Sequence, residues 1–140
     1  MQLTFKHGIH PKDNKEHSKD FSFEIMPVGE RVFIPLCQHI GKPALPVVKK
    51  DDYVKVGSLI GEAQGFISSR IHSSISGKVS GIVNRPSSSG VLIPHVVIEN
   101  DFLYEEDFLP PILDLDQSSI VNRIKECGIV GLGGATFPTH

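Results

Sequence analysis

The residues best suited to chemistry are three glycines near the end of the printed sequence. Gly131, Gly133 and Gly134 lie in the run Gly-Leu-Gly-Gly and predict a turn whose backbone N–H groups can approach a phosphate, because no Cβ atom obstructs them. Phe137, an aromatic residue, follows three positions later. Glycine-rich turns are common, and residues 135–140 do not supply the helix that usually follows a phosphate-binding turn. The turn is therefore either a cofactor site or a purely structural feature.

Histidine and cysteine are the next candidates, as metal ligands. His7 and His10 lie beside a glycine and a proline in a segment without helical periodicity, and no third ligand is near them in the sequence. We therefore interpret residues 1–20 as an ordered loop that packs on the rest of the domain. Cys37 and Cys127 are 90 positions apart and match no paired-ligand spacing, which argues against a metal or iron–sulfur cluster made by this chain alone.

His72 could serve as the base or nucleophile of a phosphocarrier or hydrolase, because serines occupy positions 68, 69, 73 and 74 around it. No acidic residue has a spacing that would orient the imidazole ring, and successive residues of a strand point to opposite faces. We interpret these serines as ordinary solvent-facing residues of a hairpin. His39 lies in a loop, where we expect neighbouring backbone to satisfy its ring.

The composition of the chain limits the kinds of partner that it can bind. Fourteen basic and 16 acidic residues give the 140-residue chain a net charge of −2, without a basic run that could follow a phosphate backbone, so nucleic acid is not expected as a partner. The most apolar run, residues 91–98, is far shorter than the roughly 20 residues that span a bilayer. We expect no direct membrane span, and membrane association through partners only.

The elements that must position these residues are centred on residues 46–83. Short apolar bursts rich in β-branched residues alternate there with glycines, which predicts short strands joined by tight turns. Two similar halves are visible: residues 53–62 turn at Gly57, and residues 71–83 turn at Gly77. Both glycines are expected at positive φ. Two such halves closing face to face predict a mainly β fold, a compact sandwich or flattened barrel.

Additional strands are predicted on both sides of this centre. Residues Phe21–Met26 alternate between large apolar and polar positions, which is typical of a half-buried strand. Residues Arg31–Leu36 predict a second strand, with a proline that places it at an edge or near its end. Residues 90–100 predict a strand that returns to the sheet after a polar loop.

The last 40 residues change character. Residues 101–116 are acidic and rich in proline, which indicates a linker that lies across a surface. Residues 117–127 place their apolar side chains at helical spacing on one face. Asp116 is a suitable N-cap for this helix and Gly128 a suitable residue to end it.

Five stretches, taken in this order, resemble the N-terminal part of the C subunit of the Rnf electron-transport complex, also called the Rsx complex. They are FKHGIHP, IPLCQHIGKPALPVV, VKVGSLIGEAQGFISSRIHSSISGKV, VIEND and ECGIVGLGGATFPTH. Each stretch alone is unspecific, but their ordered combination is specific. The resemblance covers nearly all of the chain except residues 101–116.

The resemblance implies three parts. Residues 1–100 would form a barrel-sandwich hybrid domain, related to biotinyl and lipoyl carriers, with an N-terminal extension. Residues 101–116 would be a linker. Residues 117–140 would be the truncated start of an α/β FMN- and NADH-binding domain, containing its first helix and its glycine-rich loop.

The resemblance also implies a cofactor site and a cellular role. It assigns Gly131, Gly133, Gly134 and Phe137 to the loop that cradles the FMN phosphate. The family's two 4Fe–4S clusters are bound by cysteines that this sequence lacks, so we expect a piece of a longer protein that is inactive alone and binds FMN weakly or not at all. The whole protein is expected to pass electrons between NADH, flavin and iron–sulfur centres in an ion-pumping complex. It would be held peripherally, by other subunits, on the cytoplasmic side of the inner membrane, and ferredoxin is a candidate partner.

Two alternatives remain beside this interpretation. A biotin or lipoyl carrier needs a lysine at the hairpin tip, but residues 57–77 contain none, and Gln64, Gly65 and Phe66 stand at the expected place. Arg70 cannot form the required amide. The other alternative is a non-catalytic assembly module, in which the barrel holds the protein against its membrane partners.

Overall fold

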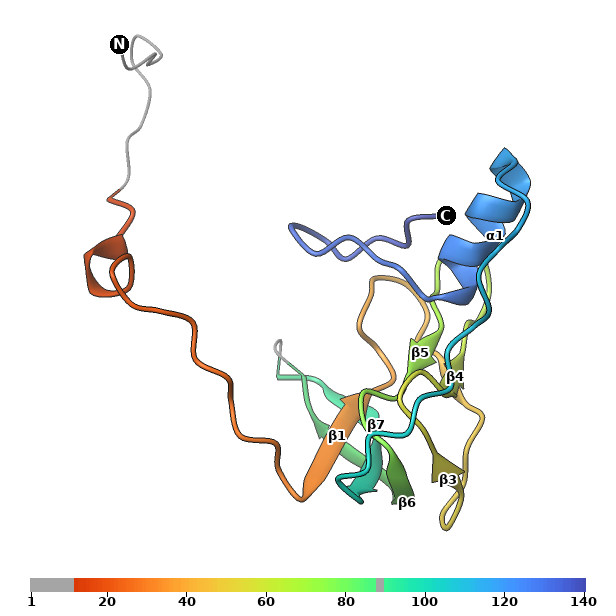
Figure 1. Ribbon diagram of the computed structural model, residues 1–140, viewed down its shortest axis with the longest axis horizontal. Coiled ribbons are helices and arrows are strands. Elements are labelled where there is room, and N and C mark those ends of the chain that lie inside the picture. Colours follow the sequence, from red (N-terminus) through yellow and green to blue (C-terminus); the bar gives the residue numbers. More distant parts are fainter. Residues whose placement is uncertain (1–11, 88–89) are drawn as a thin grey trace, which may run out of the picture.

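The computed structural model describes residues 12–87 and 90–140, and its folded centre consists of two antiparallel sheets (Figure 1). The larger sheet has the strand order β1-β7-β6-β3, formed by Arg31–Pro35, Leu92–Asn100, Gly77–Pro86 and Tyr53–Val54. The smaller sheet has the order β2-β4-β5, formed by Leu45–Pro46, Leu59–Glu62 and Ile71–His72. The mainly β fold and the strands predicted at residues 31–36 and 90–100 are confirmed.

The long hairpin of β6 and β7 forms the two central strands of the larger sheet. Its register runs from Gly77 opposite Asn100 to Pro86 opposite Leu92, with a bulge after Val79. β1 pairs along the other edge of β7. Burial is concentrated in one half of this hairpin, because residues 95–98 of β7 are all buried while β6 beyond Val79 is half-buried to exposed.

Both sheets contribute to one core. A fully buried Val, Leu or Ile side chain contributes about 1.5–3 kcal/mol relative to an exposed one, so this cluster is the main source of stability. The buried cluster comprises Ile34, Leu36, Ala44, Val54, Ile60, Ile71, Ile75, Val79, Val96 and Ile98. It draws on β1, β3, β6 and β7 from one sheet and on β4 and β5 from the other.

The two sequence halves exchange strands instead of each folding on itself. β3, from the first half, pairs with β6 of the second, and β4 of the first pairs with β5 of the second. The predicted turns are nevertheless present, since Gly57 has φ 93° and Gly77 has φ 148°. At Gly77 a Cβ atom would stand 1.9 Å from the carbonyl oxygen of Glu99, so the pairing of β6 with β7 requires glycine there.

Residues 101–116 lie against the barrel before they reach the helix (Figure 1). The amide of Val56 donates to the carbonyl of Glu105 at 2.8 Å, and the amide of Asp107 donates back to the carbonyl of Val56 at 2.8 Å. The carboxylate of Asp101 accepts hydrogen bonds from Tyr53 and from Ser76, at 2.5 and 2.6 Å. The first half of this segment is therefore fixed to the barrel.

The helix α1 spans Gln117–Glu126, as its apolar spacing predicted. Asp116 is its N-cap and accepts hydrogen bonds from the amides of Ser118 and Ser119 at 2.8 and 3.1 Å. These bonds, together with those from the two serine hydroxyls, hold the pKa of Asp116 well below its usual range. Gly128 follows the helix with φ 65°, the left-handed conformation expected of a terminating glycine.

The strand predicted at Phe21–Met26 is wrong. These residues pair with no described strand, and the side chains of Phe23 and Ile25 are almost wholly exposed. An alternating pattern defines an apolar face, but a strand also needs a neighbouring edge for its backbone hydrogen bonds. Figure 1 shows this segment leading away from the sheets, where it has no such edge.

The expectation that residues 1–20 pack on the barrel is wrong for the part that the structure describes. Residues 12–20 are all exposed and contain one short 3-10 helix, η1, at Lys15–His17. The segment is rich in charged side chains, which lose more by burial than they gain. His7 and His10 lie outside the described residues.

Candidate cofactor site

The glycine-rich segment folds as a small hairpin, residues 129–139, here called the glycine hairpin. The amide of Thr139 donates to the carbonyl of Ile129 at 3.0 Å, and the amide of Gly131 donates to the carbonyl of Phe137 at 2.9 Å. Val130 and Pro138 form an isolated antiparallel bridge between them. The structure thus places Gly131 and Phe137 opposite each other at the base, with Gly133 and Gly134 in the turn.

The turn of the glycine hairpin is open at Gly133 and Gly134 and carries backbone N–H groups that are unpaired among the described residues. A Cβ atom built on Gly133 or Gly134 would meet no described atom within 4 Å, and neither residue has a left-handed φ, so no described contact requires glycine at these positions. No described acceptor takes a hydrogen bond from the amides of Leu132, Gly133 or Gly134. Free donors on a backbone without Cβ atoms fit a ligand phosphate.

The helix next to this turn, α1, precedes the turn in the chain. This order decides which groups could attract a phosphate to the turn. The C-terminal end of α1, where the helix dipole is negative, leads into the glycine hairpin through Gly128. A phosphate at the turn would therefore depend on backbone N–H groups and on cationic side chains, of which Lys125 in the last turn of α1 is one. The sequence-based assignment of Gly131 needs one refinement, because its own amide is already engaged by Phe137.

The glycine hairpin and α1 contact the barrel at several described residues. The amide of Ile40 donates to the carbonyl of Thr136 at 3.4 Å, and Gly128 lies against the backbone of Arg70. The neighbouring His39 is buried, and its two ring nitrogens lie 2.9 Å from the carbonyl of Ile40 and 3.1 Å from the amide of Ser69. The expectation that backbone satisfies the His39 ring is confirmed, and this arrangement requires the hydrogen on Nδ1.

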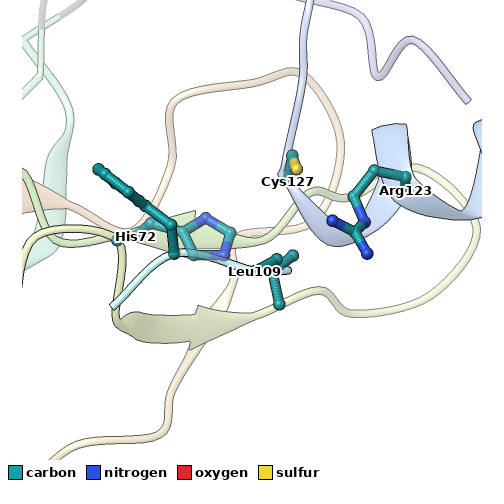
Figure 2. Close-up of a pocket in the computed structure, with 6 residues that line it drawn as sticks. His72, Leu109, Arg123 and Cys127 are labelled. Atoms are coloured by element: carbon teal, nitrogen blue, oxygen red, sulfur yellow. The ribbon is translucent and has the colours of Figure 1, made fainter. Parts of the chain in front are cut away.

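His72 faces a cavity of about 310 Å³ between the barrel, the linker and α1 (Figure 2). Its walls include Phe108 and Leu109 of the linker and Arg123 and Cys127 at the end of the helix. Burial lowers the pKa of His72, and the positive charge of Arg70 lowers it further, against a smaller opposing effect of Glu62. The ring is therefore mainly neutral at pH 7.

The serines around His72 are not solvent-facing, which corrects the sequence interpretation. Ser68, Ser69 and Ser73 are each less than 5% exposed, and only Ser74 is open to solvent. The Ser73 hydroxyl donates to the carbonyl of Ile75 at 2.7 Å, while the Ser68 hydroxyl is engaged in the loop between β4 and β5. Tight reversals of the chain leave backbone groups unpaired, and buried hydroxyls satisfy them. The Ser68 and Ser73 hydroxyls therefore serve the fold, whereas the buried Ser69 hydroxyl has no hydrogen-bond partner among the described residues.

Among the described residues, no group of three or more His, Cys, Asp or Glu side chains is arranged to hold a metal ion. Cys37 and Cys127 are both free thiols. No helix in the part of the chain that the structure describes is long and apolar enough to cross a membrane.

Sequence reasoning missed two features of this region. Asp101, within the stretch VIEND, joins Tyr53 and Ser76 through one carboxylate, and Phe66 is 97% exposed on a loop whose backbone is firmly held. The role of Asp101 becomes visible only in the folded structure, because its two partners are 48 and 25 positions away in the sequence. The exposed Phe66 did have a signal in the sequence, because an aromatic residue stands there at the place where a carrier would have its lysine.

Two sheets around one core, with strands exchanged between glycine-punctuated halves, define the class of the barrel-sandwich hybrid domains. A family model described as the RnfC barrel sandwich hybrid domain matches residues 3–103. The chain therefore belongs to the RnfC family, as the resemblance in its sequence indicated.

Individual relatives agree with this assignment. The chain is 44% identical, over 98% of its length, to the C subunit of the Na+-translocating ferredoxin:NAD+ oxidoreductase complex of Acetobacterium woodii. It is 40% identical, over 100% of its length, to the C subunit of the proton-translocating ferredoxin:NAD+ oxidoreductase complex of Clostridium ljungdahlii. The C subunit of the ion-translocating oxidoreductase complex of Rhodobacter capsulatus is 37% identical over 99% of the chain. The matched regions make up 32%, 32% and 28% of these proteins, so the chain spans about a third of the length of its curated relatives.

Proposed function

We propose that this chain is the N-terminal part of the C subunit of a membrane-associated, ion-translocating oxidoreductase complex that exchanges electrons between NADH and ferredoxin. Its relatives carry that description over nearly the whole length of the chain. The whole protein would pass electrons through FMN and two 4Fe–4S clusters, with the cluster ligands in the part that follows residue 140. It would sit peripherally on the cytoplasmic side of the membrane, held by other subunits, with ferredoxin as a further partner.

The observation that carries the cofactor part of this proposal is the open turn of the glycine hairpin. Gly133 and Gly134 are glycines without any described steric or conformational need for glycine. A ligand that approaches the backbone more closely than a Cβ atom permits explains both residues. FMN supplies such a phosphate, and when bound it can take two electrons from NADH and release them singly to iron–sulfur centres.

The test uses the complete protein, purified with whatever chain follows residue 140 in its gene. It should contain flavin after purification and reduce a dye at the expense of NADH. Gly133→Val and Gly134→Val should each lose flavin and activity, because a branched side chain fills the space of the phosphate. Gly29→Val is the control, since Gly29 also lacks a left-handed φ and a Cβ atom there would make only ordinary contacts, 3.5 Å or more from the backbone of Arg31, far from the hairpin in sequence.

The outcomes separate the two roles of the hairpin. Melting curves of the Gly133 and Gly134 variants should match that of the wild type when all three proteins are stripped of flavin, because no described atom lies near either Cβ position and bound flavin would otherwise stabilise the wild type alone. Flavin content and dye reduction that remain complete in both variants would show that the turn is purely structural. That result would leave the non-catalytic assembly module as the role of this region.

A specific observation favours an assembly role for a different segment, as a second candidate function. The apolar side chains of Phe21, Phe23, Ile25 and Met26 are between 78% and fully exposed, on an extended segment that pairs with no described strand. Such a segment is suited to bind another surface as an added strand or an apolar strip. Replacing Phe23 and Ile25 together by Ser should release the protein from its complex while flavin content stays unchanged.

A further inference from the structure

The loop that joins β4 to β5, residues 63–70, is here called the tip loop, and its backbone is held in place from within. The buried hydroxyl of Ser68 accepts a hydrogen bond from the amide of Gln64 at 2.8 Å and donates to the carbonyl of Lys42 at 2.8 Å. The amide of Lys42 donates in turn to the carbonyl of Ile67 at 3.0 Å. These three hydrogen bonds fix the backbone of the tip loop at Gln64, before Phe66, and at residues 67 and 68, after it.

Phe66 stands at the end of this fixed loop with 97% of its surface exposed. A buried phenylalanine contributes about 1.5–3 kcal/mol to stability, and Phe66 forgoes that contribution entirely. A hydrogen-bonded backbone that presents an exposed aromatic ring is the arrangement of a preorganised contact residue, because little conformational entropy remains to be lost on binding.

A cavity of about 450 Å³ lies between the tip loop and the end of the chain. Its volume falls within the roughly 300–1,000 Å³ typical of sites for small ligands. Two aromatic residues from different segments line it, Phe66 of the tip loop and Phe137 of the glycine hairpin, together with Lys125 and His140. Among the described residues, no Asp or Glu contributes to its walls. The cavity therefore suits a planar ring that carries negative charge.

The cavity adjoins the proposed phosphate loop through one residue. Phe137 lines the cavity, and its carbonyl accepts the hydrogen bond from Gly131 that closes the base of the glycine hairpin. The same hairpin thus supplies the free amides of Gly133 and Gly134 and one aromatic wall of the cavity. A phosphate and a planar ring are the two parts of a ring nucleotide cofactor.

We propose that the barrel itself forms part of the cofactor site, with Phe66 of the tip loop and Phe137 of the glycine hairpin as the two walls that enclose the planar ring of a phosphorylated cofactor, flavin or nicotinamide. Lys125 provides positive charge beside it. This inference rests on the proposed function and extends it, because it gives the barrel a direct part in cofactor binding. The tip position that holds a covalently attached group in carriers would here contact a freely bound one.

The experiment measures the binding of FMN and of NADH separately, by fluorescence titration of the complete protein stripped of flavin. Phe66→Ala should weaken the affinity for at least one of them by about tenfold, the loss expected for one aromatic stacking contact. Phe66→Tyr should restore the affinity, because its ring stacks equally well. Leu113→Ala, which removes another almost wholly exposed apolar side chain that does not line the cavity, is the matched control and should leave both affinities unchanged.

The outcomes distinguish this inference from the function on which it rests. A loss for FMN alone assigns the cavity to the flavin ring, and a loss for NADH alone assigns it to nicotinamide. Affinities within twofold of the wild type in Phe66→Ala, together with loss of flavin in Gly133→Val, would overturn the inference and leave the proposed function standing. A stripped wild-type protein that binds neither compound would overturn both. Because Phe66 is exposed, a changed melting curve in Phe66→Ala would contradict its assignment as a contact residue.

Discussion

Gly128 lies so close to Arg70 that a Cβ atom at position 128 would stand 2.2 Å from the Arg70 carbonyl oxygen. This contact brings the residue that ends α1 onto the chain just before β5. Since the glycine hairpin begins at the next residue, the packing of Gly128 against Arg70 determines where the hairpin stands relative to the barrel.

Gly128→Ala should therefore be costly. The substitution combines a left-handed φ of 65° with a collision against backbone that cannot move aside, and we expect a loss of about 2 kcal/mol or more in the free energy of unfolding. Gly133→Ala, at an open position without left-handed φ, should cost nothing measurable. Urea denaturation of both variants checks this expectation. Equal stability of the two would mean that α1 is not docked on the barrel.

The bond between Tyr53 and Asp101 predicts a limit to stability at high pH. The carboxylate of Asp101 raises the pKa of Tyr53 to about 12 by accepting its hydrogen bond. Because the folded pKa lies above the ordinary value of 10, the bond stabilises fully below pH 10, and this contribution disappears as pH rises through about 12. The stability difference between wild type and Tyr53→Phe should therefore shrink as the pH is raised from 10 towards 12, measured by urea denaturation. A difference that does not vary with pH would contradict the bond.

The same carboxylate predicts an effect at low pH. Hydrogen bonds from Ser76 and then Tyr53 lower the pKa of Asp101, so its contribution is present above its ordinary pKa of 3.8 and is lost as pH falls through the lower folded value. Asp101→Asn should remove this dependence and loosen the linker from the barrel. Amide hydrogen exchange at Leu103 and Glu105, whose amides bond to Asp101 and Ser76, reports that loosening. Unchanged protection in the variant would argue against this role of Asp101.

His72 should titrate below its ordinary pKa of 6.5. Burial favours the neutral ring, as does the charge of Arg70, so the unfolded chain binds this proton more readily than the folded one. Stability should consequently decrease as pH falls through 6.5, and His72→Gln should abolish that decrease. NMR titration of the His72 ring measures the pKa directly, and Arg70→Gln should raise it. A midpoint at or above 6.5 would show that the ring is more open to solvent than its cavity indicates.

The barrel should carry no covalent cofactor. Residues 63–70 contain no lysine, and the exposed residue at the tip is Phe66. Protein made in cells with active biotin and lipoate ligases should have the intact mass of the bare chain. An added mass equal to either group would revive the carrier interpretation.

Local signals in the sequence were sufficient where a single segment decides its own structure. The helix of residues 117–126 was predictable with its cap, because Asp116 and Gly128 act within one turn of their positions. The turns at Gly57 and Gly77 were predictable because only glycine adopts these φ values without strain. The alternation of Phe21–Met26 failed as a strand signal, since pairing depends on an edge elsewhere in the molecule.

The family resemblance assigned Gly131, Gly133, Gly134 and Phe137 to a cofactor site, which stays a prediction, and the structure places all four on one hairpin. The surroundings of these residues could not be predicted from the sequence. The cavity that Phe66 and Phe137 share lies between segments about 70 positions apart, and no periodicity encodes such a meeting. The exchange of strands between the two halves was hidden for the same reason, because the halves have similar sequences and either pairing satisfies their alternation.

Residues 101–110 would transmit a force from the barrel to α1. The carboxylate of Asp101, the paired amides of Val56 and Asp107, and the bond from Arg123 to the carbonyl of Pro110 pin this stretch at successive points. Because these hydrogen bonds hold the stretch at several points between the barrel and α1, we expect small displacements of the barrel to move α1 and the glycine hairpin with it. In an assembled complex, a neighbouring subunit that displaces the barrel would thus also displace the glycine hairpin.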